Sequence, residues 1–381
     1  MKINLRSFGI AALLALLLAC QPSTDPTAGK MIFRYNQASG LSSLDPAFAR
    51  VQGNIWACRQ LYNTLVDLNE DLLPVPSLAK SWQVQDSGRT YRFTLRHDVF
   101  FHDFNCGDNT IERLPLRAKD VKFSFSRLLD KDLASPGTWV MRPVEEIVVC
   151  NDSVLEIRLK KAFPPFLSML SMAYCSVVPE LAFSCENRDF GTNPVGTGAF
   201  QFQKWLWNEK LVFRKNPNYF ERDEAGRPLP YIDAVSIRFL PEKQAEYLEL
   251  LRGRIDMVSG LDPSYVDDAI SSNGELNPRY RNELLMLKGP YLNTEYLGIY
   301  LGDLPDGPHD LQDAELRKAA HLAFDRQSML THLRKGVGEA AGRSIVPPSL
   351  PGSLEKEDGN SFNAAAAREL IHAWKLRNQG R

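Results

Sequence analysis

A glycine-bounded bend followed by two aromatic-rich runs, at residues 193–220, constrains the fold more than any other stretch of this chain. Gly196 and Gly198 flank Thr197, and glycine lets a backbone take a positive φ or approach another segment closely. The runs that follow are separated by a short polar turn at residues 208–210, which indicates a β-hairpin. The bend is expected to be accessible to a substrate, although on the residues alone a plain core hairpin is the favoured interpretation.

Composition is that of an ordinary globular protein. The chain has 381 residues, 44% of them hydrophobic and 24% charged, which is enough for two or more packed cores. The formal net charge is −1, and lysine and arginine are scattered along the chain without forming a basic stripe. We therefore expect no nucleic-acid partner.

The N-terminus has the features of an export signal. Lys2 and Arg6 precede an apolar run at residues 8–19 that is too short to cross a bilayer. The run ends in Leu-Leu-Ala-Cys, similar to a bacterial lipobox, which makes residues 1–19 a signal peptide and Cys20 the predicted lipidation site. A cleaved signal that happens to contain a cysteine is the alternative. Residues 20–30 then form a flexible tether, so we expect an exported lipoprotein, anchored in a membrane and facing the periplasm or the cell exterior.

The remaining cysteines are odd in number, and they are Cys58, Cys106, Cys150, Cys175 and Cys185. In an oxidising compartment at least one of them is unpaired within the chain. Cys175 and Cys185 flank a short loop and could pair, but spacing does not determine connectivity. There is no CxxC motif, so neither a zinc nor an iron-sulfur site is expected, and no metal or cofactor is predicted.

Hydrophobic periodicity predicts the main elements. Alternating apolar residues predict strands near residues 31–35, 91–96, 152–159 and 235–240. Apolar stripes predict helices over residues 117–129, 310–324 and 363–375, and a further helix between Pro241 and Gly253. A strand at residues 255–258 would complete a βαβ unit with a right-handed crossover and a parallel pair.

Several segments of the sequence, in their order along the chain, resemble the bacterial extracellular solute-binding proteins of family five, the oligopeptide and dipeptide receptors of ABC importers. The resemblance rests on SLDP at residues 43–46, FFHD at 100–103, RAKDVKFSFSRLL at 117–129, PVGTGAFQFQKW at 194–205, LPYID at 229–233 and LRKAAHLAFDRQSML at 316–330. It covers roughly residues 31–374, nearly all of the chain after the tether.

The resemblance implies an α/β fold with two lobes, of the type II periplasmic-binding-protein class, including the extra antiparallel subdomain of peptide receptors. It places lobe I at residues 31–258, with an inserted subdomain at about 58–190, a crossover at 259–290 and a partial lobe II at 291–381. A strand over residues 291–301 would open the second lobe. Family members run considerably further, so the second lobe is expected to be incomplete, with unpaired sheet edges.

The same resemblance implies a ligand cleft between the lobes. In the family the loop after the first strand lies at the cleft edge, which selects Ser39, Gly40 and Leu41. A surface turn with Asp45 capping the next helix is the alternative. Trp139 stands where oligopeptide receptors project an aromatic side chain toward the ligand, with ordinary interdomain packing as the alternative. The predicted site is completed by Gly196, Thr197, Gly198 and Tyr296.

The function implied is that of a monomeric substrate-binding lipoprotein, which captures a peptide or similar small solute and delivers it to permease and ATPase subunits. No GxSxG, HExxH or Walker motif is present, so no catalytic residues are predicted and a hydrolase is disfavoured. Alternatives are a nickel, opine or oligosaccharide receptor, or a truncated or remnant member that acts as a surface lipoprotein without transport. The family's carboxylate that pairs with a peptide amino terminus would lie beyond residue 381, so weak or absent peptide affinity is expected.

Overall fold

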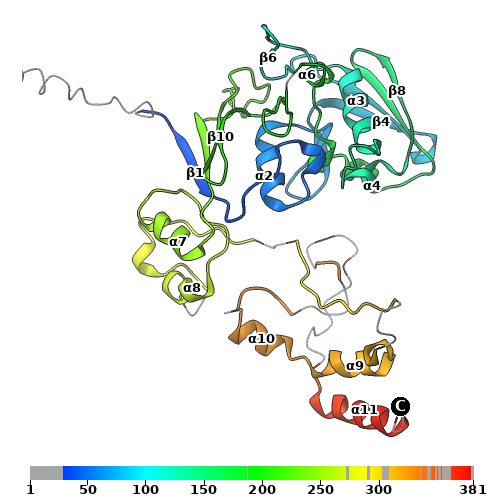
Figure 1. The fold of residues 1–381 in the computed structure, drawn as a ribbon, viewed down its shortest axis with the longest axis vertical. Helices are drawn as coiled ribbons and strands as arrows, with labels where there is room; N and C mark the ends of the chain where they lie inside the picture. Colours follow the sequence, from blue (N-terminus) through cyan, green and yellow to red (C-terminus); the bar gives the residue numbers. More distant parts are fainter. Residues whose placement is uncertain are drawn as a thin grey trace, which may run out of the picture. The chain divides into compact units, whose positions relative to one another are not determined.

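The structure, a computed structural model, describes residues 29–186, 188–271, 274–289, 292–302, 309–334, 336–340, 345–347, 350, 353 and 362–378. It divides after Ser259 into two compact units, Met1–Ser259 and Gly260–Arg381 (Figure 1). The predicted signal peptide and Cys20 lie outside the described residues. No helix in the described part of the chain combines the length and apolar character needed to cross a bilayer.

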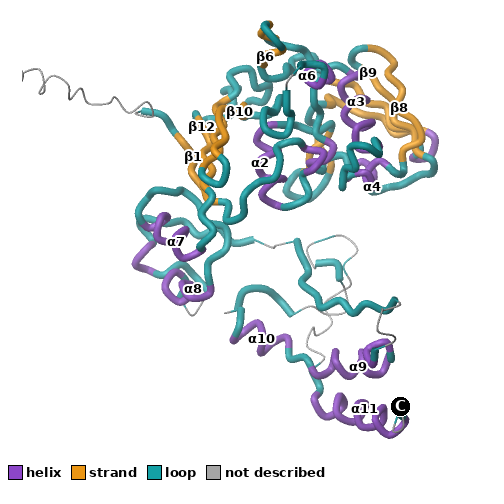
Figure 2. The backbone as a smooth tube through the Cα atoms, viewed as in Figure 1, coloured by secondary structure: helices purple, strands orange, loops and turns teal. Residues whose placement is uncertain are grey.

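A four-stranded sheet in the order β1-β12-β11-β10 lies in the first unit (Figure 2). β1 (Ile32–Asn36) is parallel to β12 (Ala234–Arg238), and the hairpin of β10 (Phe200–Leu206) and β11 (Lys210–Lys215) adds two antiparallel strands. Leu211 and Ile237 are paired across the sheet and completely buried, as is Phe213 on the same strand. The predicted first strand, the hairpin and the strand near residues 235–240 are confirmed.

The βαβ unit after β12 is only partly formed. The predicted helix is α7 (Lys243–Leu251), but the strand predicted at residues 255–258 is reduced to one parallel bridge between Met257 and Tyr35. The Asp256 N–H donates to the Arg34 carbonyl at 2.7 Å, while the Asp256 carboxylate accepts the Arg34 N–H at 2.6 Å. The Asp256 side chain therefore accepts the Arg34 N–H, which the backbone of a neighbouring strand would otherwise bind, and no regular ladder forms between β1 and residues 255–258.

A second, antiparallel sheet has the order β4-β5-β9-β8. Its strands are β4 (Ala79–Gln85), β5 (Thr90–Leu95), β8 (Val144–Asn151) and β9 (Val154–Leu159). α3 (Ala118–Leu129) contacts β8 and buries Val121, Phe125 and Leu128 along one stripe. The strands predicted near residues 91–96 and 152–159 and the helix predicted over 117–129 are confirmed.

Short elements connect the two sheets. Two small antiparallel pairs are β2 (Val66–Leu68) with β3 (Pro74–Pro76), and β6 (Phe104–Cys106) with β7 (Asn109–Ile111). The helices are α2 (Gln52–Leu61), α4 (Thr138–Met141), α5 (Phe166–Met169) and α6 (Glu180–Phe183), with 3-10 turns at Pro46–Phe48, Asp86–Gly88 and Ala173–Cys175. The Asp45 carboxylate accepts the Ala47 N–H at 3.0 Å and caps the 3-10 turn Pro46–Phe48. The helix that Asp45 was considered to cap, α2, begins after Val51 without a side-chain cap.

A disulfide joins Cys106, at the end of β6, to Cys185, just after α6. The pairing of Cys175 with Cys185 that we considered is wrong, because Cys175 is buried as a free thiol with its sulfur 3.7 Å from the Met169 carbonyl. The bonded cysteines are 79 residues apart, and closing a loop of that length stabilises a fold by about 4.5 kcal/mol in the chain-entropy treatment. Cys58 is also a buried free thiol, while Cys150 is exposed.

The second unit is mainly helical where it is described. Its elements are α8 (Pro263–Ala269), α9 (Ala314–Ala323), α10 (Arg326–His332) and α11 (Ala364–Arg377), with 3-10 turns at Pro278–Tyr280 and Asp310–Gln312. α11 packs on α9, and the Asn363 side chain caps α11 by accepting the Ala366 N–H at 2.9 Å. The helices predicted over residues 310–324 and 363–375 are confirmed.

The strand predicted over residues 291–301 is wrong. Residues 292–302 contain no strand, and no described segment pairs with them. Leu297 is 92% exposed and Tyr300 is also exposed, so the apolar positions of this run are not buried against a partner. A strand is defined by its ladder, and an apolar pattern without a neighbouring strand does not form one.

Candidate functional site

The C-terminal ends of β1 and β12 lie side by side at one end of the first sheet (the sheet end). In α/β proteins, ligands bind beyond the carboxyl ends of parallel strands. Asn36, the last residue of β1, is buried and holds the sheet end together. Its amide donates to the Leu240 carbonyl at 3.0 Å, and its side-chain oxygen accepts the Leu240 N–H at 2.7 Å. The Gln37 N–H donates to the Arg238 carbonyl at 2.9 Å. These bonds fix the point from which the next loop departs.

That loop contains the three site residues predicted after the first strand. Ser39 and Gly40 are exposed, whereas Leu41 is only 4% exposed and belongs to the core. Gly40 lies against the turn of the β10–β11 hairpin, because a Cβ on Gly40 would be 2.8 Å from the Asn208 side-chain oxygen. The loop and the hairpin turn therefore occupy the same end of the sheet, with Ser39 and Gly40 open to solvent.

Two tryptophans at this hairpin turn were not selected from the sequence. The rings of Trp205 and Trp207 stack with centroids 4.3 Å apart and planes inclined by 27°. Trp207 is 58% exposed, and the Trp205 indole N–H is buried without a hydrogen-bond partner among the described residues. The available signal was their spacing, since side chains two residues apart on a strand share a face. They add an aromatic surface beside the loop that carries Gly40.

The glycine bend is packed inside the first unit. A Cβ on Gly196 would lie 2.0 Å from the Leu61 carbonyl oxygen, and one on Gly198 would lie 2.4 Å from the Leu61 carbonyl carbon. Thr197 is 1% exposed and donates its hydroxyl to the Asn63 side-chain oxygen at 3.0 Å. The bend therefore docks on the C-terminal end of α2, and the expectation of an accessible bend is wrong. A ligand-contacting role for these three residues stays a prediction.

His102 fastens the bend through both ring nitrogens. Nδ1 accepts the Gly196 N–H at 3.2 Å, and Nε2 donates to the Gly198 carbonyl at 3.1 Å. The Asn216 amide donates to the same Gly198 carbonyl at 2.9 Å. Burial lowers the pKa of His102 to about 4, so the imidazole is neutral at pH 7. The neutral ring has one donor and one acceptor, and both are used here for packing.

The last two predicted site residues lie elsewhere. Trp139 is on α4, which contacts α3, and is 43% exposed. Tyr296 belongs to the second unit, where it is 74% exposed. Neither is among the residues that hold the sheet end of β1 and β12. Their ligand-contacting roles remain predictions.

Two of the hollows lined by described residues of the first unit contain none of the predicted ligand residues. One, of about 280 Å³, lies between the β6–β7 pair and the β10–β11 hairpin and contains Arg188 and Arg214. The other, of about 440 Å³, lies beside Arg96 and Phe220. Within the residues that the structure describes, no cluster of three or more histidine, cysteine, aspartate or glutamate side chains could hold a metal ion.

Comparison with known sequences identifies relatives for most of the chain. The profile of the bacterial extracellular solute-binding proteins, family 5 middle region, matches residues 74–380. Heme-binding protein A of Haemophilus influenzae is 26% identical over 95% of this chain and 67% of its own length. The dipeptide-binding protein of Escherichia coli is 24% identical over 82% of this chain and 57% of its own length. The chain thus spans only part of the length of these relatives.

Solved structures share the fold. A dipeptide binding protein from Pseudoalteromonas sp. SM9913, in complex with Met-Leu, has a TM-score of 0.75 and 20% identity over 90% of this chain and 66% of its own. The periplasmic binding protein DppA of Helicobacter pylori, in complex with the peptide STSA, has a TM-score of 0.68 and is 22% identical over 92% of this chain and 67% of its own. At these identities the likeness concerns the fold alone, and it confirms the two-lobed α/β class expected from the sequence.

Proposed function

This chain belongs to the bacterial extracellular solute-binding proteins of family 5, and on that premise we propose that it captures a small solute at the sheet end of β1 and β12 and delivers it to an ABC importer. One observation carries the choice of place. Ser39 and Gly40 are exposed at the carboxyl end of a parallel strand pair, directly beside the hairpin turn that carries the exposed Trp207.

The proposed ligand is a di- or tripeptide. An exposed loop next to a strand end offers backbone N–H and C=O groups, which bind an extended peptide by strand-like hydrogen bonds. The face of Trp207 supplies an apolar surface for one peptide side chain, and stacked aromatic rings bury area at little cost in side-chain entropy. Relatives named as dipeptide-binding proteins support this class of ligand.

Calorimetric titration of the full chain with Met-Leu and with a mixture of tripeptides tests the proposal. The titration extends to millimolar peptide, because weak affinity is expected. The binding affinity for peptide should fall roughly tenfold in Trp207→Ala, because one well-placed aromatic contact is lost. Tyr231→Ala is the control, because it removes a half-exposed aromatic ring just before the N-terminal end of β12 and should bind as the unchanged chain does.

Two outcomes would contradict this proposal. If no peptide gave saturable binding, the proposal of peptide capture would be wrong. If the affinity for peptide fell in Trp139→Ala but not in Trp207→Ala, the binding site would not be at the sheet end. Haem is included as a separate titrant because a relative is named as a heme-binding protein. Saturable haem binding without peptide binding would leave solute capture in place and replace the ligand class.

We also propose that the chain is exported and anchored through Cys20, on the strength of its N-terminal sequence. A lipid-modified chain expressed in bacteria should partition into the detergent phase of a Triton X-114 extract. Cys20→Ser should move the protein into the aqueous phase. Equal partitioning of the two chains would exclude an anchor at this residue.

A further inference from the structure

We propose that the hollow between the β6–β7 pair and the β10–β11 hairpin binds a small oxyanion, a carboxylate or a phosphate, between the side chains of Arg188 and Arg214. This site is separate from the sheet end of β1 and β12, and none of its lining residues is among the predicted ligand residues. Its volume of about 280 Å³ lies just below the usual range of pockets for drug-sized ligands, so it suits a small ion or a single terminal group.

The positive charge of Arg188 is half-buried, and none of the described carboxylates pairs with it. Its Nη1 donates to the Asn105 carbonyl at 2.9 Å, and its Nη2 donates to the Asn193 side-chain oxygen at 3.3 Å. Its Nε–H is buried and has no hydrogen-bond partner among the described residues, and no described carboxylate forms an ion pair with it. Burial lowers the pKa of this guanidinium. A desolvated cation with an unused donor is unfavourable unless an anion joins it.

Arg214 brings a second positive charge to the same hollow. It lies on β11, and its Nη2 donates to the Gln201 side-chain oxygen at 3.2 Å, which leaves the rest of its planar fork for a ligand. Like Arg188, it has no ion pair among the described residues. The hollow is lined by further polar groups from Asn105, Thr110 and Asn193.

The charge balance of the hollow favours an anion. Asp103 is the acidic residue in its lining, and the Asp103 carboxylate accepts the Arg113 N–H at 3.0 Å. His102 also lines the hollow and is neutral at pH 7 because its pKa is about 4. Arg188 and Arg214 therefore outweigh the single carboxylate. The forked donors of arginine match the paired oxygens of carboxylate and phosphate.

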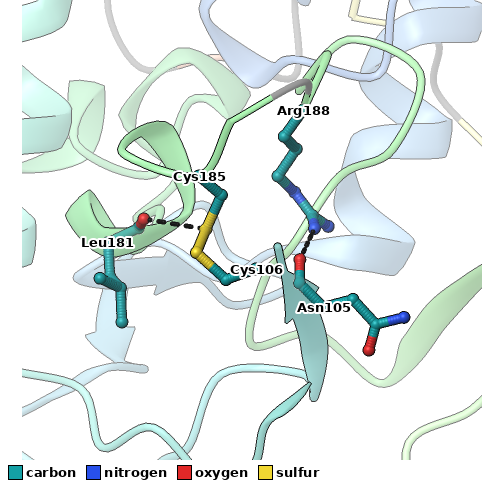
Figure 3. The surroundings of a disulfide bond; sticks show 5 residues. All are labelled: Asn105, Cys106, Leu181, Cys185 and Arg188. Atoms are coloured by element: carbon teal, nitrogen blue, oxygen red, sulfur yellow. Dashed lines mark hydrogen bonds between the residues drawn. A yellow bond between two sulfur atoms is a disulfide. The ribbon is translucent and has the colours of Figure 1, made fainter. Parts of the chain in front are cut away.

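The Cys106–Cys185 disulfide positions one wall of this hollow. Figure 3 shows the bond beside Arg188, whose guanidinium points to the carbonyl of Asn105. Asn105 precedes the bonded Cys106 on β6, and Arg188 follows Cys185 along the chain. The covalent link therefore ties the strand that accepts from Arg188 to the segment that carries Arg188. The Arg188 side chain also lies over the Phe104 ring, 5.1 Å from its centroid.

Calorimetric titration of the full, oxidised chain with sodium phosphate and, separately, sodium acetate tests this site, with ionic strength held constant by sodium chloride. We expect saturable binding of at least one of these anions, and the comparison tells phosphate from carboxylate. Arg188→Gln and Arg214→Gln should each weaken binding roughly tenfold or more, the effect of losing a charge-assisted pair. Arg142→Gln, which removes an exposed positive charge outside the hollow, should bind as the unchanged chain does.

The alternatives are distinguishable from the same measurements. No saturable heat with either anion up to about 20 mM, a weak limit for a site with paired charges, would overturn the proposal. The proposal would also be overturned if Arg188→Gln and Arg214→Gln both bound the anion with the affinity of the unchanged chain. Circular dichroism checks the fold of each variant, and if Arg188→Gln does not fold, Arg214→Gln decides alone because Arg214 is exposed on its strand. Trp207→Ala should leave anion binding unchanged, so failure of the sheet-end site would not be mistaken for failure here.

Discussion

His102 makes the stability of the first unit sensitive to acid. Its pKa is about 4 in the folded chain, against about 6.5 for an unperturbed histidine. As pH falls from 6.5 toward 4, the unfolded chain binds a proton that the folded chain excludes, so the free energy of unfolding decreases. Between pH 7 and pH 5 this one residue should remove about 2 kcal/mol. Urea denaturation at the two pH values measures the loss.

Glutamine at position 102 separates the proton from the packing. Its side chain has an acceptor oxygen and an NH₂ donor group, which can replace the acceptor and donor nitrogens of the neutral imidazole, but it does not titrate. Between pH 7 and pH 5, the free energy of unfolding of His102→Gln should therefore decrease by about 2 kcal/mol less than that of the unchanged chain. The same slope in both chains would show that other groups cause the acid sensitivity.

Gly198 tests whether the bend is set by close packing. A Cβ at this position would meet the Leu61 backbone at 2.4 Å, and a backbone atom cannot move aside as a flexible side chain can. Gly198→Ala should lower the free energy of unfolding by about 2–3 kcal/mol. Gly289→Ala is the control, because a Cβ on Gly289 would have no neighbouring atom within 4 Å, and the change should stay within about 0.5 kcal/mol. Similar unfolding midpoints for both variants would contradict the packing role.

At the scale of single residues, the sequence indicated which loop lies at the sheet end but not which side chains are open. Ser39, Gly40 and Leu41 were chosen together because their loop lies at the cleft edge in the family that the sequence resembles, yet the Leu41 side chain is buried in the core. Trp207 was passed over because an aromatic residue in a strand is usually core, and only its place at the end of a hairpin exposes it. The hollow that contains Arg188 and Arg214 could not be predicted either, because only tertiary packing places these two residues around one cavity.

Among the elements, α3 is joined to the loop before α2 by an ion pair that is almost fully buried. Arg127 donates to both oxygens of Asp45, at 2.6 and 3.2 Å, and lies over the Phe183 ring, 4.2 Å from its centroid. Arg127→Met removes the charge and leaves the Asp45 carboxylate buried without its partner. The free energy of unfolding should fall by about 3–5 kcal/mol, measured by urea denaturation.

The control for this element contact is Arg89→Met. Arg89 pairs with Glu145 at 3.7 Å, but both side chains are more than half exposed, so the change should cost at most about 1 kcal/mol. Adding Asp45→Asn to Arg127→Met should recover part of the loss, because the unpaired charge is removed. Equal losses in Arg127→Met and Arg89→Met would show that burial does not strengthen the first pair.

Elements with a strong pattern and a local partner were predicted well from the sequence. The β10–β11 hairpin and the helices α3, α9 and α11 all depend on neighbours within a few residues or on one apolar stripe. The strand predicted over residues 291–301 was wrong because a strand also needs a distant partner, which its own residues do not specify. The disulfide was unpredictable for the same reason, since spacing does not bring Cys106 and Cys185 together.

For the whole molecule, the division after Ser259 predicts that residues 29–259 fold on their own. This unit contains both four-stranded sheets and the disulfide, whereas the second unit exposes large apolar side chains, with Leu285, Leu287 and Leu297 each more than 80% exposed. The shorter chain should unfold in one cooperative transition and bind less of the dye ANS per molecule than the full chain. A shorter chain that lacks a cooperative transition would show that the first unit depends on the second.

The pairing of β1 with β12 sets an order of events during protein synthesis. The Met31 N–H reaches the Asp233 carboxylate across 202 residues, so the first strand leaves the ribosome long before its neighbour exists. At 5–20 residues per second the wait is about 10–40 seconds. Nascent chains arrested before residue 234 should be cut by protease near β1, and chains arrested well beyond Arg238 should be protected there. Until then, the half-buried side chains of Ile32 and Phe33 are available to a chaperone that holds extended apolar segments.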